Sequence, residues 1–395
     1  MSAAVCTTHI QDVDRITGSN PADGTGRTRR VGGERGPEAG ATAIGTGLPP
    51  AAGIDAATHR RDRRGTSGLM FGIELTPEHP VGRVVELGVA AEAAGYDAAF
   101  VSSHYNNRDP FAVLARLAAE TDEIRLGPGV VNPYEVHPVT LAGKVATIAE
   151  ASGGRGVFGI GPGDPSTLRN LGLADERGLR SVLEAFEVAR RLWAGERVDH
   201  DGTFEATDAG LNFDVPGEIP VYVGGEGPHM CRMAGKRADG LLFNGSHPDD
   251  LAWARERVEE GRTDRRDGPG EFDLAAYASV SVGRDREAAR EAARPPVAFI
   301  AAGAAPPVLD RHGIDADRAG EIGDRISEGA FREAFGLVTP AMVDAFCVAG
   351  TVETVADRMA AVLAHADSLV VGSPLGPDVD EAIALAAEAH DRATA

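Results

Sequence analysis

The chain has 395 residues, of which 43% are hydrophobic, and a formal net charge of -21. An acidic excess of this size excludes nucleic acid as a partner, because phosphate binding needs clustered cations, and no apolar run reaches the roughly 20 residues that span a bilayer. We therefore expect a cytoplasmic protein that does not bind membranes, and the three cysteines, Cys6, Cys231 and Cys347, show no metal-binding spacing.

The charge balance also suggests a source. Of the 39 basic residues only Lys144 and Lys236 are lysines. Acidic surfaces of this kind are typical of proteins from salt-loving archaea, where high salt screens the repulsion between acidic groups. An acidic enzyme from a GC-rich bacterium is the alternative interpretation.

Residues 1–69 differ from the rest of the chain. They are rich in Gly, Ala, Thr and Arg and show no hydrophobic periodicity, a composition typical of disorder. The pair Arg29-Arg30 is not followed by an apolar stretch, so it does not indicate export. We predict a disordered extension without a function of its own, followed by a single catalytic domain over residues 70–395.

From Met70 onward, short runs rich in β-branched residues alternate with helical patterns. This alternation is typical of parallel βαβ units, and eight strands favour a closed (β/α)₈ TIM barrel over a doubly wound sheet. We predict strands at 71–75, 98–104, 124–131, 156–161, 220–224, 240–244, 274–282 and 368–372.

Two connections are long enough to be insertions. One follows strand four, over residues 164–219, and includes a helix across 181–192. The other follows strand seven, over residues 284–367, and we expect a loop within it at 301–307. Barrel enzymes bind substrates at the carboxyl ends of their strands, so the functional residues should lie there.

The first two strands each supply a candidate. In strand one, alternation places Glu74 on the face opposite Phe71 and Ile73. A buried carboxyl there has a raised pKa and suits a general acid, unless it belongs to an ion pair inside the barrel. After strand two, Ser103 and His104 begin a polar cluster; His104 could contact a ring cofactor, shuttle a proton or simply bond loop carbonyls.

Strands three and four end in glycines. Gly129 and Val130 follow strand three, and Gly161 ends strand four; such glycines indicate either close approach of a ligand or barrel curvature. Asp164 could accept hydrogen bonds from adjacent N–H donors of a ligand, or it could cap the helix that follows.

The fifth strand ends in a loop that opens a helix. A glycine loop in this position presents free N–H groups to an anion, so we expect a phosphate site there. The sequence contains no metalloprotease or nucleophile-elbow motif, which argues against those hydrolases. The loop residues are Gly224, Gly225, Glu226, Gly227 and Pro228.

Taken together, these segments resemble the coenzyme F420-dependent 5,10-methylenetetrahydromethanopterin reductases, which belong to the bacterial luciferase-like superfamily of barrels. The resemblance runs in order from about Met70 to the C-terminus. The segments that carry it are Phe71-Gly72-Ile73-Glu74, His104-Tyr105-Asn106-Asn107, Leu126-Gly127-Pro128-Gly129-Val130, Gly159-Ile160-Gly161-Pro162-Gly163-Asp164, Val297-Ala298-Phe299-Ile300-Ala301-Ala302-Gly303 and Gly372-Ser373-Pro374-Leu375-Gly376-Pro377-Asp378.

The resemblance implies a reaction in which reduced F420 gives a hydride to the methylene carbon of a reduced pterin. The pterin would be tetrahydromethanopterin or tetrahydrofolate. Glu74 would protonate the departing pterin nitrogen, and Asp164 would bind the pterin. Gly129 and Val130 would form a non-prolyl cis peptide behind the deazaflavin. The other cofactor contacts implied are Ser103, His104, Gly161 and the loop 224–228.

Two positions depart from the family pattern. Ser103 stands where the family usually has Asp, and Glu226 adds a negative charge beside the expected phosphate, which is unfavourable. The alternatives are another F420- or FMN-dependent luciferase-like oxidoreductase or monooxygenase, or a barrel that only binds the cofactor. A homo-oligomer is expected from the resemblance alone.

Overall fold

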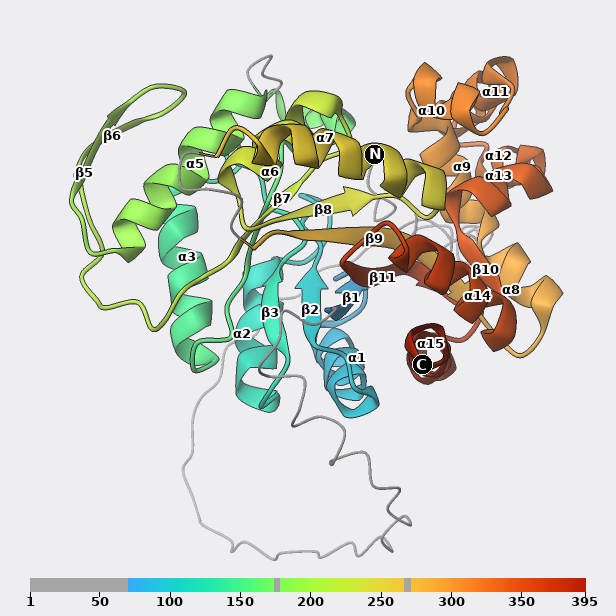
Figure 1. The fold of residues 1–395 in the computed structure, drawn as a ribbon, viewed down its shortest axis with the longest axis horizontal. Helices are drawn as coiled ribbons and strands as arrows, with labels where there is room; N and C mark the ends of the chain where they lie inside the picture. The colour runs from blue at the N-terminus through green and yellow to red at the C-terminus, as the bar shows by residue number, and fades with distance from the viewer. Residues whose placement is uncertain (1–69, 174–177, 266–270) are drawn as a thin grey trace, which may run out of the picture. The chain divides into compact units, whose positions relative to one another are not determined.

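The structure, a computed structural model, describes residues 70–173, 178–265 and 271–395 (Figure 1). The expectation of a disordered extension over residues 1–69 lies outside these ranges.

The described residues form a ring of eight parallel strands, and each predicted strand is present. The hydrogen-bonded order is β3-β2-β1-β11-β9-β8-β7-β4, and parallel bridges of Leu126 with Gly156 and of Val131 with Ile160 join the two ends. The closed barrel is thus confirmed over the doubly wound alternative. The strands are β1 (Phe71–Leu75), β2 (Ala98–Val101), β3 (Arg125–Pro128), β4 (Phe158–Ile160), β7 (Val221–Gly224), β8 (Gly240–Asn244), β9 (Asp273–Val282) and β11 (Ser368–Leu375).

Helices cover the outside of the barrel (Figure 1). Their starts follow local rules: the Asp109 side chain accepts hydrogen bonds from the backbone N–H groups of Phe111 and Ala112, and Pro110 occupies the first helical position. The helices are α1 (Val81–Ala94), α2 (Pro110–Glu120), α3 (Pro138–Ala151), α5 (Gly178–Trp193), α6 (Pro228–Arg237), α7 (Pro248–Arg262), α14 (Val352–Leu363) and α15 (Val379–Thr394).

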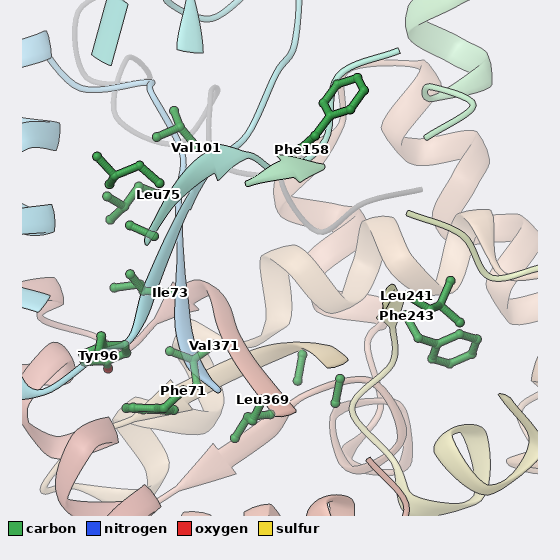
Figure 2. Packing of buried hydrophobic residues seen from close by; sticks show 14 of the residues in the cluster. Phe71, Ile73, Leu75, Tyr96, Val101, Phe158, Leu241, Phe243, Leu369 and Val371 are labelled. Carbon is green, nitrogen blue, oxygen red and sulfur yellow. The ribbon is translucent and has the colours of Figure 1, made fainter. Parts of the chain in front are cut away.

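Strand alternation separates two cores. Phe71, Ile73 and Leu75 lie along one side of β1 (Figure 2) and belong to the large apolar core that includes the surrounding helices. The other face of the strands forms a smaller apolar cluster inside the barrel, which includes Phe100 and Tyr277. Glu74 alternates with the outward residues of β1, so its side chain is directed into the barrel.

A polar network occupies the amino-terminal end of the barrel interior. The Tyr222 hydroxyl donates to Asp273 Oδ2 at 2.7 Å, and the Ser368 hydroxyl donates to the same oxygen at 2.9 Å. The backbone N–H of Met70 donates in turn to the Ser368 hydroxyl at 2.9 Å. These groups fill the end of the barrel opposite the strand carboxyl ends.

Both predicted insertions are present. After β4 come α4 (Pro165–Leu171), α5 and an antiparallel hairpin of β5 (Val198–Asp201) and β6 (Glu205–Ala209). After β9 comes a group of helices with an apolar core of its own. This group comprises α8 (Arg286–Ala292), α9 (Arg294–Gly303), α10 (Pro306–Arg311), α11 (Ala316–Ser327), α12 (Phe331–Leu337) and α13 (Pro340–Phe346), followed by β10 (Val348–Gly350).

The loop expected at residues 301–307 is wrong. Helix α9 continues to Gly303 and α10 starts at Pro306, so only Ala304 and Ala305 lie between helices. The reason is burial: Val297, Ala298 and Ala301 lie in the core of the inserted helices, and alanine is the strongest helix former.

Within the described ranges, we find no helix that is both long enough and apolar enough to cross a membrane.

Candidate functional site

The carboxyl ends of the eight strands meet at one rim of the barrel, and every site residue predicted from the sequence lies at that rim. Because the strands are parallel in a closed ring, neighbouring strand ends are also neighbours in space. The residues in question are Glu74 in β1, Ser103 and His104 after β2, Gly129 and Val130 after β3, Gly161 and Asp164 after β4, and residues 224–228 at the end of β7.

Glu74 is a buried acid. Its residue is 2% exposed, and burial raises its pKa to about 7, while the backbone of Ser373 and the hydroxyl of Tyr277 act in the opposite direction and the charge of Glu78 acts with burial. Neither carboxyl oxygen makes a hydrogen bond of ordinary geometry with a described residue, and no ion pair to Glu74 occurs there. These observations favour the general acid over the structural ion pair, because a carboxyl with a pKa near 7 holds a transferable proton at neutral pH.

The space around Glu74 depends on glycine. A Cβ on Gly372, the neighbouring residue on β11, would lie 2.5 Å from Glu74 Oε2. No larger residue fits at Gly372 unless the carboxyl moves, so the glycine leaves the space that the Glu74 carboxyl occupies.

The peptide bond between Gly129 and Val130 is cis, as the family resemblance implies. A Cβ on Gly129 would lie 2.7 Å from both Phe100 Cβ and the Tyr277 hydroxyl oxygen. The Tyr277 hydroxyl donates to the Gly129 carbonyl at 3.3 Å. This peptide is therefore packed tightly against the inner face of the barrel, at the end of β3, two strands away from Glu74 in β1.

Val130 and two glycines form a smooth surface beside that peptide. A Cβ on Gly161 would lie 2.8 Å from Val130 Cγ2, and one on Gly224 would lie 3.0 Å from the same atom. The absence of side chains at both glycines lets Val130 pack directly on backbone. Close approach of this kind is a usual reason for glycine at a strand end.

His104 is held neutral. Burial lowers its pKa, and the negative charge of Asp164 partly offsets that effect. The electrostatic interaction shows that the loops after β2 and β4 come together. Ser103 and His104 line a cavity of about 200 Å³ that extends toward Asn107, Asn132 and Lys144.

Asp164 caps a helix. Its Oδ1 accepts a hydrogen bond from the Thr167 N–H at 2.8 Å, at the start of α4. The capping alternative is thus confirmed.

The loop 224–228 has two kinds of glycine. A Cβ on Gly225 would lie 2.4 Å from Met230 Cγ, whereas one on Gly227 would meet no atom within 4 Å. Gly227 is the N-cap of α6, and no side chain caps this helix. The first N–H groups of α6 are consequently open to an anion.

Glu226 lies in this loop and accepts a hydrogen bond from a residue of the neighbouring strand. The Asn244 amide, at the end of β8, donates to Glu226 Oε1 at 2.8 Å. The amide partly compensates the negative charge that the sequence places beside the expected phosphate.

Sequence reasoning missed the inner residues of β9. Tyr277 lies inside the barrel, and Ser279, two residues on, follows it on the same face by alternation. The hydroxyls of Ser279 and of Ser102 are buried without a hydrogen-bond partner among the described residues. The period-two pattern of the predicted strand 274–282 could have identified Tyr277 and Ser279.

Comparison with known proteins agrees with this geometry. The model of the luciferase-like monooxygenase family matches residues 54–367. A 5,10-methylenetetrahydromethanopterin reductase from Archaeoglobus fulgidus is 40% identical over 323 residues, which are 80% of this chain and 97% of the relative. One from Methanolobus tindarius is 38% identical over 319 residues, or 80% of this chain and 98% of the relative.

A solved structure is also similar. The coenzyme F420 dependent tetrahydromethanopterin reductase from Methanopyrus kandleri superposes with a TM-score of 0.77 at 37% identity, covering 81% of this chain and 97% of that one. The closed barrel and the family match make this chain a member of the luciferase-like monooxygenase family. Within it, the chain belongs to the 5,10-methylenetetrahydromethanopterin reductases.

Proposed function

We propose that this protein transfers a hydride from reduced coenzyme F420 to the methylene carbon of 5,10-methylenetetrahydromethanopterin, giving the 5-methyl pterin. The observation that carries the proposal is that a buried acid, Glu74, lies at the same barrel rim as the closely packed, glycine-bearing ends of β3, β4 and β7. The names of the related proteins support both the cofactor and the pterin.

The residues at the rim fit the cofactor. Val130, Gly161 and Gly224 provide a low surface for a planar ring, and the uncapped start of α6, after Gly225 and Gly227, suits a phosphate. When bound, F420 supplies the hydride from C5 of its ring.

Glu74 provides the proton. Its O–H bond breaks as an N–H bond forms at the pterin nitrogen, and the ring C–N bond to that nitrogen breaks, which leaves the methylene carbon as an electrophilic iminium. The carboxylate takes a proton again from solvent before the next turnover. A pKa of about 7 balances holding the proton against releasing it.

Three polar residues complete the proposed site. His104, held neutral by burial, would contact the cofactor ring as an uncharged hydrogen-bonding group, and Ser103 lies beside it. Asp164, at the start of α4, would bind the amino-pterin edge. We assign these roles from position at the rim.

The assay that tests this function mixes purified protein, reduced F420 and the methylene derivative of either tetrahydromethanopterin or tetrahydrofolate. We expect the absorbance of oxidised F420 to rise with at least one pterin, and the faster one to identify the substrate. Reduction of oxidised F420 by a sugar phosphate or an alcohol, or turnover only with FMN and oxygen, would point to the other branches of the family.

Replacing Glu226 with Gln should tighten F420 binding. The side chain is exposed and can still accept from Asn244, so the change removes a negative charge beside the anion site and keeps that hydrogen bond. Two charges about 5 Å apart in water-like surroundings interact by about 1 kcal/mol, so the Kd for F420 should fall about threefold to fivefold at low salt and less at 1 M salt.

The matched control is Glu218→Gln. Glu218 is exposed and precedes β7, at the opposite end of the same strand. A fluorescence titration with oxidised F420 should show no change for this variant. Equal Kd values for F420 in the wild type and in both variants would contradict an anion site at the loop 224–228.

We also propose that the protein works at high salt. With a net charge of -21, self-repulsion destabilises the folded state, and the screening length falls from about 10 Å at 0.1 M salt to about 3 Å at 1 M. Both the melting temperature and kcat should rise between 0.1 and 2 M KCl. Full activity and an unchanged melting temperature in dilute buffer would favour the bacterial interpretation.

A further inference from the structure

Tyr277 links the proposed acid to the cis peptide. It is buried in the barrel interior, 6% exposed. Its hydroxyl donates to the Gly129 carbonyl at 3.3 Å and also interacts with the Glu74 carboxyl. One phenolic oxygen thus donates to the peptide expected to lie behind the cofactor and acts electrostatically on the residue expected to give the proton.

The strand register and the neighbouring ring hold Tyr277 in this position. Tyr277 pairs with Val370 on β11, which pairs in turn with Gly72 on β1, so the tyrosine lies two residues below the level of Glu74. Its ring meets that of Phe100 edge to face, with centroids 6.2 Å apart and an interplanar angle of 68°. With its ring held, the hydroxyl has only the rotation of its O–H bond left free.

That rotation allows the Tyr277 O–H two hydrogen-bonding orientations. The Gly129 carbonyl can only accept a hydrogen bond. While Glu74 is protonated, the Tyr277 O–H donates to Gly129 and its oxygen can accept from the carboxyl. Once Glu74 has lost its proton, the same O–H can turn and donate to the carboxylate. Donation to the ionised form stabilises it.

We propose that Tyr277 is a positioning residue that holds the Glu74 carboxyl and stabilises its carboxylate after proton transfer. The inference deepens the proposed function, since it assumes that Glu74 is the proton donor. None of the sequence segments that carry the family resemblance includes Tyr277.

The groups that act on Glu74 agree with this role. Burial raises the pKa of Glu74, the Ser373 backbone and the Tyr277 hydroxyl lower it, and Glu78 is the charged group that raises it further. Burial raises the pKa of Tyr277 well above its usual value, as does the Glu74 carboxylate, so the phenol remains protonated. Loss of the hydroxyl should therefore raise the pKa of Glu74.

The first test uses the protein without cofactor. The stability of the wild type and of Tyr277→Phe is measured by urea unfolding from pH 5 to 9, each against the same protein carrying Glu74→Gln. The pKa of Glu74 is raised in the folded state, so its contribution to stability is present at low pH and is lost as pH rises through about 7. We expect this loss to shift upward by about one pH unit in Tyr277→Phe.

The second test is the pH profile of turnover. In Tyr277→Phe, kcat at pH 6 should fall about tenfold, the alkaline limb should move to higher pH, and KM for F420 should change less than twofold. Tyr222→Phe is the control, because it removes another buried barrel hydroxyl, at the opposite end of the interior. It should leave both pH profiles in place.

Failure of the proposed function and failure of the proposal for Tyr277 can be told apart. If no F420 activity exists, the unfolding series still reports whether Tyr277 sets the pKa of Glu74. Identical pH dependence of stability in the wild type and Tyr277→Phe would overturn the proposal. Should Tyr277→Phe not fold, 3-fluorotyrosine labelling provides the opposite change: a more acidic phenol donates more strongly, so the stability loss should be complete at a lower pH. An unchanged end point of the loss would equally refute the idea.

Discussion

Glu74→Gln should lower kcat by about 10² to 10⁴-fold, the usual contribution of a general acid. Gln has the same shape and cannot donate a carboxylic proton. Binding of oxidised F420 should change little, because the proposed cofactor contacts lie on other strands. The measurement is the initial rate of F420 oxidation at saturating pterin, with the Kd for F420 determined alongside.

The same variant should be more stable than the wild type above neutral pH. The folded-state pKa of Glu74 is raised from 4.5 to about 7, so the native state binds the proton more tightly and the stability due to Glu74 is lost as pH rises through 7. The shift corresponds to about 3 kcal/mol at pH 8, which Glu74→Gln should recover.

Glu86→Gln is the control for both measurements, since Glu86 lies exposed on α1 and pairs only with Arg83 among the described residues. An inactive but stabilised Glu74→Gln would separate a lost acid from a damaged fold. Turnover equal to the wild type would remove Glu74 from the mechanism.

Gly129→Ala should lower kcat/KM by about a hundredfold and destabilise the protein by about 1–3 kcal/mol. The new methyl group would lie 2.7 Å from Phe100 Cβ and from the Tyr277 oxygen, so the strand end, the tyrosine or both must shift. Overpacking costs that range of stability, and a displacement of about 1 Å at a catalytic site can cost a hundredfold in rate.

Gly320→Ala serves as the contrasting substitution. Gly320 lies exposed within α11, where a Cβ meets no atom within 4 Å. It should stabilise the protein by up to about 1 kcal/mol and leave kcat unchanged. If Gly129→Ala behaved in the same way, the close packing around the cis peptide would have no functional consequence.

The barrel could be predicted because each strand has a recognisable local sequence pattern. Runs such as Ala98–Val101 and Gly240–Asn244 combine β propensity with flanking turns, and their regular alternation with helices leaves few possible topologies. The rim location of the site then follows from the architecture, which is why Glu74 and Gly129 could be named in advance.

Other features depend on contacts between distant segments. Tyr277 becomes a candidate only once β9 is known to lie two places from β1, and no local pattern reports that distance. The helix that replaced the expected loop at 301–307 depends on burial by Ile322 and Phe346, which lie in the same small core but far along the chain. Asp164 shows another limit of prediction from sequence, because the same residue caps a helix and is also proposed to contact a ligand.

The polar network of Tyr222, Asp273 and Ser368 fills one end of the barrel interior, and this has a kinetic consequence. Both reactants must enter and leave at the same rim. Whichever molecule lies deeper has to arrive first and depart last, so the flat reductant against Val130 would be trapped while the pterin is bound above it. Turnover would then follow a compulsory order, and an early excess of pterin would slow the enzyme.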